Sequence, residues 1–405
     1  MTIRHRNCTL GTSLQAAIVL FVSMLAITGH AQKLTVLHSF SGPPGDGAEP
    51  EAGVFLGRNG SLYGTTWVGG TADSGMVFEV GRAGKERVLS DLAGSTGGMP
   101  QAVLVSDSKG NLYGTATSGG QYGGGTVFEL SKGGKFTVLH AFTGGADGGD
   151  PQASGLIRDR EGNLYGTTTY GGDPVCGCGV VFKLDAAGNE TVLHSFTDSP
   201  DGAAPYAGLT RDAAGNLFGT TYFGGSGAKN CGHDSEACGT VFEVSATGEE
   251  TVLYSFNGTT DGDEPRAGVI RDREGNLYGV GTSDGQYGYG SVYKVDRRGT
   301  ETVLHAFTGG MDGGLPLGGL TSDSDGNLYG TTYVGGNLHS CGGGCGVVFK
   351  IERDGKETVL HSFTLDEGVF PFAGLVRDSA GNLYGTTWEG GAGSCGCGTV
   401  FKLTL

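Results

Sequence analysis

Basic residues are scarce in this sequence. Lysine and arginine together number 26, against 42 aspartate and glutamate residues, which gives the 405-residue chain a formal net charge of -16. Phosphate binding needs clustered Lys and Arg side chains, so we expect no nucleic-acid partner. An acidic balance fits a soluble protein, or one that attracts cations.

Other classes of protein are excluded by patterns that the sequence lacks. Glycine accounts for 82 of the 405 residues, yet there is no strict Gly-X-Y period, which excludes a collagen-like fibre. No window keeps a 3.6-residue apolar period, so helical repeats are excluded as well. Valine, leucine, phenylalanine and tyrosine recur at fixed places instead, and this combination predicts a turn-rich β protein.

The one apolar run is too short to span a bilayer comfortably. It covers residues 14–27, follows a short basic head, and precedes the small residues around Gly29-His30-Ala31. This order is typical of a cleavable export signal. We therefore expect residues 1–31 to be a signal peptide and residues 32–405 to be periplasmic or extracellular, without membrane insertion. An uncleaved anchor is the alternative.

One short phrase occurs seven times. Residues 162–168 read GNLYGTT, and the Leu-Tyr or Leu-Phe core recurs at Leu62, Leu112, Leu217, Leu277, Leu328 and Leu383. Variants of TVLHSF and GTVFKL keep the same spacing, and an element such as AGLVRD precedes the phrase each time. These elements are short, rich in Val, Leu, Phe, Tyr and Thr, and bounded by Gly, Asp, Asn or Pro, which indicates strands.

Four short strands per repeat, seven times in tandem, predict an all-β fold: a seven-bladed β-propeller with four antiparallel strands per blade. The sequence after the export signal begins with a TVLHSF strand, residues 35–40, and ends with a GTVFKL strand. Pairing the two closes the ring and removes a free edge. We place the blades of this single domain at about 50–92, 100–142, 151–196, 205–256, 265–307, 316–363, and 371–405 with 33–40.

The repeated pattern DG..P.AGL..D..GNLYGTT..GG...GTVFK resembles the GloVer repeat, a tandem glycine-rich repeat of bacterial exported proteins. The resemblance covers almost all of residues 32–405. It implies an exported repeat protein of unassigned activity and carries over no catalytic residues. Two copies depart from the pattern, at residues 57–61 and at Val280-Gly281.

Residues used identically in every blade usually serve packing. We interpret the Leu-Tyr phrase in this way, because Tyr can bury its ring and keep its hydroxyl bonded. One strand position holds His38, His140, His194, His305 and His361, with Ser90 and Tyr254 in the remaining two blades that carry it. A ligand set seldom tolerates Ser and Tyr, so we interpret these histidines as hydrogen-bonding spacers between blades.

Functional residues are expected where the loops vary. The loops between the second and third strands of a blade, and those between blades, vary in length and lie together on what we call the loop face. The strand ends there carry the candidate ligand-binding residues Trp67, Tyr222, Tyr333 and Trp388. Flat aromatics beside carboxylates suit stacking on a sugar, and packing between blades is the alternative.

The same face repeats Asp-Gly-x-x-Pro. Further candidate ligand-binding residues are Asp147, Asp201, Asp261 and Asp312, while residues 94–100 of the equivalent loop hold no acid. A ring of carboxylates would attract Ca²⁺ or a cationic ligand, whereas an Asx-turn before proline is the structural alternative. We expect no organic cofactor and leave calcium open.

Apart from Cys8 in the export signal, the cysteines come as two per loop in four blades. Local disulfides in an exported protein produce this parity, which predicts Cys176–Cys178, Cys231–Cys238, Cys341–Cys345 and Cys395–Cys397. Cross-links between neighbouring loops and a zinc site with His233 or His339 are the alternatives.

We expect an exported, monomeric and non-catalytic binding module that recognises a saccharide or another extracellular molecule on the loop face. A glycosidase or lyase would need paired carboxylates there, and no Ser-His-Asp set, phosphate loop or cofactor motif stands out. A protein-interaction scaffold is the third hypothesis. One asymmetric acid with a raised pKa in a pocket of this face would favour the enzyme, and a band of aromatics would favour saccharide binding.

Overall fold

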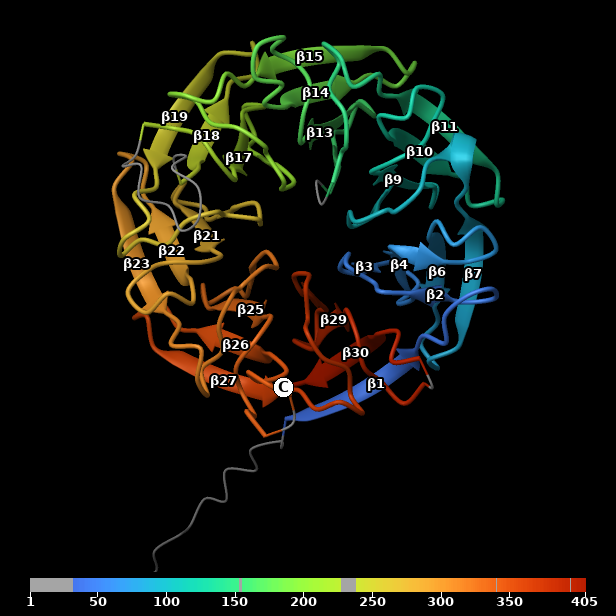
Figure 1. Cartoon of the computed structure of the whole chain (residues 1–405), viewed down its shortest axis with the longest axis vertical. Coiled ribbons are helices and arrows are strands. Elements are labelled where there is room, and N and C mark those ends of the chain that lie inside the picture. The colour runs from blue at the N-terminus through green and yellow to red at the C-terminus, as the bar shows by residue number, and fades with distance from the viewer. Residues whose placement is uncertain (1–31, 153–154, 227–237, 340, 394) are drawn as a thin grey trace, which may run out of the picture. The chain divides into compact units, whose positions relative to one another are not determined.

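The computed structural model describes residues 32–152, 155–226, 238–339, 341–393 and 395–405. These residues form seven four-stranded antiparallel sheets arranged as a ring (Figure 1), which confirms the seven-bladed β-propeller. The predicted export signal, residues 1–31, lies outside the described residues. Within the described ranges, no helix is long and apolar enough to cross a membrane.

Each blade runs from a two-residue inner strand near the axis to a longer outer strand. The first four blades consist of β3 (Phe55–Leu56), β4 (Leu62–Thr66), β6 (Met76–Val80) and β7 (Glu86–Asp91); β8 (Val105–Ser106), β9 (Leu112–Ala116), β10 (Thr126–Leu130) and β11 (Phe136–Ala141); β12 (Ile157–Arg158), β13 (Leu164–Thr168), β14 (Val180–Leu184) and β15 (Glu190–Ser195); β16 (Thr210–Arg211), β17 (Leu217–Thr221), β18 (Thr240–Val244) and β19 (Glu250–Ser255).

The fifth and sixth blades repeat this order. They consist of β20 (Ile270–Arg271), β21 (Leu277–Gly281), β22 (Ser291–Val295) and β23 (Glu301–Ala306), and of β24 (Thr321–Ser322), β25 (Leu328–Thr332), β26 (Val347–Ile351) and β27 (Glu357–Ser362). Two small elements lie in the loops: β2 (Gly47–Ala48) pairs with β5 (Val68–Gly69), and η1 is a single 3-10 turn at Gly94–Thr96.

The seventh blade closes the ring as predicted. It contains β28 (Val376–Arg377), β29 (Leu383–Thr387) and β30 (Thr399–Thr404), and its outer strand is β1 (Lys33–Ser39) from the start of the domain. Figure 1 shows β1 in blue beside β30 in red. The two chain ends thereby share one sheet, and neither leaves an unpaired edge between the first and last blades.

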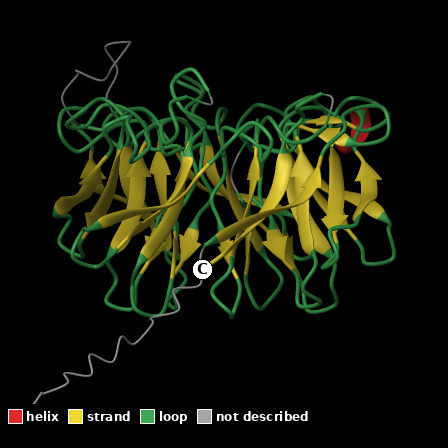
Figure 2. Ribbon diagram, turned by 90° about the horizontal axis from the view of Figure 1, so that it is seen from below, coloured by secondary structure: helices red, strands yellow, loops and turns green. Residues whose placement is uncertain are grey.

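The longer loops lie on one side of the sheets and the short turns on the other (Figure 2). In the short turn of the third blade, the Asp159 carboxylate accepts hydrogen bonds from the backbone N–H and the side-chain amide of Asn163. The same carboxylate accepts the hydroxyl hydrogen of Tyr165 at 3.0 Å. The repeated Asp and Asn therefore form the turn, as these residue types predict.

The hydrophobic core lies between blades. One cluster combines Tyr165 and Val181 of the third blade with Leu209 and Phe242 of the fourth. The Arg211 guanidinium of the fourth blade lies over the Tyr165 ring, 5.5 Å from its centroid. Tyr165 buries its ring and keeps its hydroxyl bonded, so in this blade the phrase serves packing, as predicted.

In four blades the threonine that follows Leu-Tyr-Gly or Leu-Phe-Gly joins the blade to the next one. Its hydroxyl donates to the carbonyl of the alanine that precedes the neighbouring inner strand; the pairs are Thr167 to Ala207 (2.9 Å), Thr220 to Ala267 (3.0 Å), Thr331 to Ala373 (2.9 Å) and Thr386 to Ala52 (2.9 Å). These bonds are buried, so water cannot replace either partner. The looser fifth blade has Val280 at this position.

Replacing one of these threonines by its isostere tests their contribution to stability. We expect Thr220→Val to lower the free energy of unfolding by about 1–3 kcal/mol, because the buried carbonyl of Ala267 loses its donor. Chemical denaturation of residues 32–405 measures the change. The exposed Thr251→Val is the matched control and should change stability by less than about 0.5 kcal/mol. Equal effects of the two substitutions would contradict the role of the bond.

Candidate functional site

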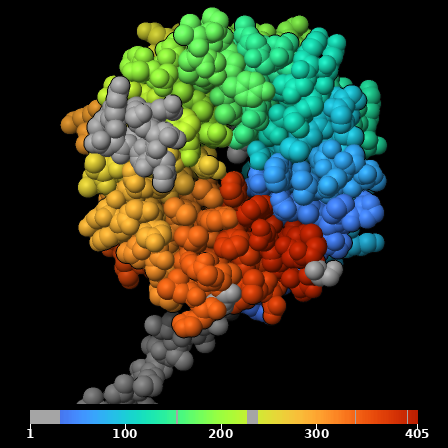
Figure 3. Space-filling view, in the orientation of Figure 1, coloured from blue at the N-terminus to red at the C-terminus, as the bar shows by residue number. Residues whose placement is uncertain are grey.

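Every blade begins with a proline, one variable residue and a short apolar segment that leads into the inner strand. The variable residues are Glu51, Gln101, Gln152, Tyr206, Arg266, Leu317 and Phe372. All seven line one cavity of about 470 Å³. Figure 3 views the loop face, which is hollowed at the centre of the ring. The cavity is therefore one site to which every blade contributes one variable side chain.

A left-handed backbone places these side chains. The residue before each proline has a positive φ, between 47° and 58°, in every blade: Glu49, Met99, Asp150, Ala204, Glu264, Leu315 and Phe370. This conformation costs roughly 1–2 kcal/mol per residue for side chains other than glycine. Such strain persists only where surrounding contacts hold it in place.

Hydrogen bonds to the preceding blade supply those contacts. The N–H of Ala204 donates to the carbonyl of Cys178 at 2.9 Å, and the N–H of Phe370 donates to Cys345 at 3.0 Å. In the other direction, the N–H of Trp388 donates to the carbonyl of Phe370 at 3.1 Å. The left-handed residue is thus held from both sides, and the residue after proline is fixed at the cavity.

The disulfides lie directly beside this contact. Cys176–Cys178, Cys341–Cys345 and Cys395–Cys397 are formed as predicted. Cys238 is disulfide-bonded too, and its predicted partner Cys231 lies outside the described residues. The zinc alternative fails for the loop with His339, because a disulfide leaves no thiolate for a metal. In each bridge the second cysteine offers the carbonyl that the next blade uses.

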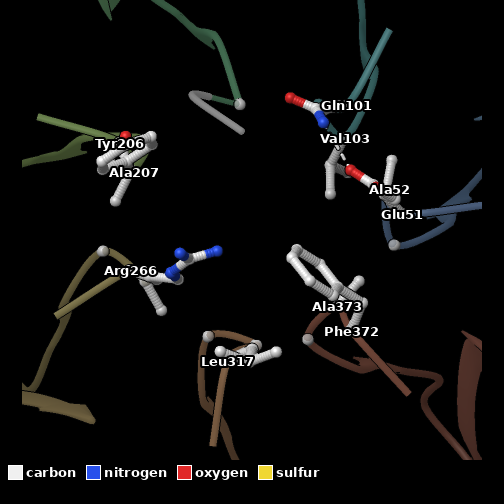
Figure 4. Close-up of a pocket in the computed structure, with 18 of the residues that line it drawn as sticks. Glu51, Ala52, Gln101, Val103, Tyr206, Ala207, Arg266, Leu317, Phe372 and Ala373 are labelled. Carbon is white, nitrogen blue, oxygen red and sulfur yellow. Dashed lines mark hydrogen bonds between the residues drawn. The ribbon is translucent and has the colours of Figure 1, made fainter. Parts of the chain in front are cut away.

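The cavity is asymmetric. Glu51 accepts a hydrogen bond from the Gln101 side-chain amide, and burial raises the pKa of its carboxyl to about 7 against the opposing effect of that bond. Across the cavity, the Arg266 guanidinium lies 5.2 Å from the centroid of the Tyr222 ring. Figure 4 shows this guanidinium and the Phe372 ring pointing toward one another. In the described part of the chain Arg266 forms no ion pair with a carboxylate.

Two of the predicted aromatics gather beside the cavity. Tyr333 stacks on Phe370 at a centroid distance of 4.9 Å, and it contacts Trp388 at 6.3 Å and Phe372 at 6.4 Å. We call these four residues the aromatic cluster. The Trp388 indole N–H donates to the Glu49 carboxylate at 3.3 Å. The cluster thus joins the apolar side of the cavity to its acidic side.

The other two predicted aromatics are elsewhere. Tyr222 lies by Arg266, where its hydroxyl donates to the Glu264 carboxylate at 2.6 Å and its ring meets Tyr206 edge-on at 4.9 Å. Trp67 forms no ring contact with the aromatic cluster. None of the four predicted aromatics lines the cavity itself. They form a second layer behind the residues that follow proline.

The comparisons with known proteins agree with this architecture. The model of the Gloeobacter/Verrucomicrobia repeat matches residues 22–233 and 228–405. The chain belongs to this repeat family. The resemblance to the GloVer repeat is thereby confirmed. No curated protein matches the chain.

Solved structures share the fold at low sequence identity. The extracellular domain of a protein described as a one-component system from B. thetaiotaomicron is 11% identical, with a TM-score of 0.54 over 91% of this chain and 42% of that one. A gluconolactonase from Xanthomonas campestris is 15% identical, with a TM-score of 0.46 over 92% and 89%. A luciferin-regenerating enzyme is 15% identical, with a TM-score of 0.45 over 75% and 90%. Of the three, only the first has a TM-score above 0.5, and at 11% identity it supports the fold alone.

The predicted ring of aspartates lies away from the cavity, beside the ends of the outer strands. Distances from the histidine Nε2 to the aspartate Oδ2 are 3.5 Å for His140–Asp147, 3.0 Å for His194–Asp201 and 3.4 Å for His305–Asp312, and the Tyr254 hydroxyl donates to Asp261 at 2.7 Å. Each aspartate also accepts the backbone N–H that opens its own loop. Cation binding by these aspartates stays a prediction.

The histidine and the aspartate occur together. Ser90 replaces the histidine in the first blade, and the loop that follows it, residues 94–100, carries no acid. A third group belongs to the same set: burial raises the pKa of Glu190, Glu250, Glu301 and Glu357 to about 7, with nearby aspartates adding to the effect. At the junction with Ser90 the equivalent residue is Phe136. At this junction all three polar groups are lost together, whereas at two others one group is replaced: Tyr254 stands in place of the histidine, and Leu34 in place of the glutamate.

These four glutamates predict a pH dependence of stability. Their carboxyls titrate near pH 7 in the folded protein and near pH 4.3 when unfolded, so the folded state binds more protons in between. Stability from these groups is therefore complete below about pH 4.3 and is lost as the pH rises to about 7. We expect Glu190→Gln/Glu250→Gln/Glu301→Gln/Glu357→Gln to gain stability relative to the wild type between pH 5 and pH 8, measured by chemical denaturation.

The difference in stability between the wild type and the quadruple glutamine variant isolates the contribution of the four glutamates. Burial lowers the pKa of His140 and His305, which gives an opposite slope below about pH 6.5 in both proteins. That slope cancels in the difference between the two. Parallel stability curves for the two proteins would contradict the raised pKa values.

Proposed function

We propose that the chain is an exported binding protein that takes a saccharide into the cavity at the centre of the loop face. One observation carries the proposal: the residue after proline, which lines the cavity in every blade, changes its chemical class around the ring, while the proline before it and the short apolar segment after it repeat. Glutamate, two glutamines, tyrosine, arginine, leucine and phenylalanine occupy this position. Packing alone would favour one residue type in every blade.

The available groups suit a molecule with a polar edge and an apolar face. The amides of Gln101 and Gln152 can both donate and accept hydrogen bonds, as hydroxyl groups require. Arg266 adds a planar set of donors, and the rings of Tyr206 and Phe372 supply flat apolar surface. A cavity of about 470 Å³ falls within the usual size range for small-molecule sites.

An enzyme acting in the same cavity is the second candidate, favoured by Glu51. Its carboxyl has a pKa raised to about 7, and a general acid works best when its pKa lies near the working pH. Glycoside hydrolysis also needs a second carboxylate. Glu49 is close enough to raise the pKa of Glu51 further. Binding without conversion needs no such pair, so we place the binding function first.

Removing the apolar wall tests the proposal. A glycan array of residues 32–405 identifies the bound saccharide, and calorimetry measures its affinity. We expect Phe372→Ala to weaken binding about tenfold, since an aromatic contact is worth about 1.4 kcal/mol. The matched control is Tyr122→Ala, which removes a loop-face tyrosine that is 58% exposed and should leave affinity unchanged.

Three results separate the functions. Failure of every saccharide to bind would refute the proposal. Equal losses in Phe372→Ala and Tyr122→Ala would place the ligand outside the cavity. Turnover of a bound saccharide that Glu51→Gln abolishes, with binding retained, would favour the enzyme.

A further inference from the structure

We propose that the saccharide is an amino sugar, with its ammonium group against Glu51 and Glu49 and its hydroxyl groups toward Arg266. This inference rests on the proposed function and narrows its ligand class. It follows from the charge of the loop face, from the acidic wall of the cavity, from the aromatic cluster and from the opposite wall.

The charge of the loop face has one sign almost throughout. Acidic side chains occupy six of the seven loops between blades, for example Asp147, Asp312 and Asp366, and several loops within blades, for example Asp73 and Asp173. Among the described residues of these loops, Arg266 is the only lysine or arginine. A concave surface lined by one sign of charge concentrates ligands of the opposite sign. The field at the cavity therefore favours a cationic ligand over a neutral or anionic one.

The acidic wall holds a buried carboxylate without an ion-pair partner. Glu51 is surrounded by the Gln101 amide, the cavity wall and the like charge of Glu49, and the positive charge of Arg266 acts on it without forming an ion pair. Burial and a like charge both disfavour the ionised form. A ligand ammonium beside Glu51 would favour that ionised form, and it would form charge-assisted hydrogen bonds with it. A sugar carboxylate in the same place would meet two like charges.

The aromatic cluster completes an ammonium site. Phe372 lines the cavity, and behind it Tyr333 lies close enough to Glu51 for the carboxylate charge to add to the burial that raises the Tyr333 pKa. Trp388 is oriented by its hydrogen bond to Glu49. Cations bind over aromatic faces, most strongly over tryptophan, and gain most where water is excluded. Ring faces and carboxylates at one wall are the groups that hold an ammonium.

The opposite wall sets the direction of the ligand. Arg266 repels a cation and has donors available for hydroxyl oxygens, since no carboxylate in the described residues pairs with it. Gln152 lines the cavity midway between Glu51 and Arg266 in blade order. A ligand with one ammonium end and several hydroxyl groups satisfies both walls at once. A linear polyamine satisfies only one.

Calorimetry with three matched trisaccharides tests the inference. The probes are a β-1,4-linked glucosamine trimer, its N-acetylated form and the glucose trimer, titrated into residues 32–405 at pH 6. We expect the glucosamine trimer to bind at least tenfold more tightly than the other two. Glu51→Gln should remove most of this preference, because it keeps the shape of the side chain and removes its charge.

Two controls separate a specific site from general attraction. Asp366→Asn removes an exposed carboxylate of the same face and should keep the preference. Glu49→Gln removes the charge beside Glu51 and should also reduce the preference, and thermal unfolding verifies that each variant folds. A preference that Asp366→Asn reduces as much as Glu51→Gln would overturn the inference, since the binding would then reflect only the net charge.

The remaining outcomes distinguish this inference from the proposed function. Equal affinities for the three trisaccharides, or tighter binding of a galacturonate trimer, would overturn the amino-sugar inference and leave saccharide binding intact. Binding of spermidine without binding of any saccharide would overturn both.

Discussion

The structure depends on the hydrogen bonds that fasten each blade to the next where the chain approaches the axis. A left-handed residue before proline donates its N–H to a loop carbonyl of the preceding blade, as Ala204 does to Cys178. The threonine of that preceding blade, here Thr167, donates to the alanine two residues beyond the proline, Ala207. The proline that lies between these two bonds has its own φ fixed by its ring. The variable side chain at the cavity is therefore held from both sides.

This arrangement separates stability from recognition. The groups that join the blades are backbone atoms, threonine hydroxyls, and the His, Asp and Glu sets of the outer rim, and most blades keep them. The residue after proline is fixed by its neighbours and makes no repeated contact of its own, so it is free to change. A cavity with an acidic wall, an aromatic cluster and an arginine can arise in this way on a ring of similar blades.

The sequence predicted the fold almost completely. Short segments rich in Val, Leu, Phe, Tyr and Thr and bounded by Gly and Asp indicated the strands of the blades. The mismatch between the first and last strands predicted that β1 would pair with β30, as it does. Three of the four predicted disulfides are formed in the described residues. These features could be predicted because each depends on the residue types of a short segment or on the even number of cysteines in a loop.

The central cavity could not be predicted from the same letters. Its seven residues lie in loops whose direction depends on a positive φ at Leu315, Phe370 and their equivalents. The residue types at these positions do not predict a positive φ. One signal was present: the residues on either side of the repeated proline change chemical class from blade to blade. The recurrence of the outer-rim aspartates is typical of a ligand set and also of a structural Asx-turn. Their joint loss with the histidine at Ser90 indicated a structural partner.

The most direct test of this account is a crystal structure of residues 32–405 with a bound glucosamine oligomer. The account predicts that the ligand lies in the central cavity, with its ammonium between Glu51 and the aromatic cluster and its hydroxyl groups on Arg266. A ligand bound at the outer rim, beside Asp147 or Asp312, with the central cavity empty, would contradict it.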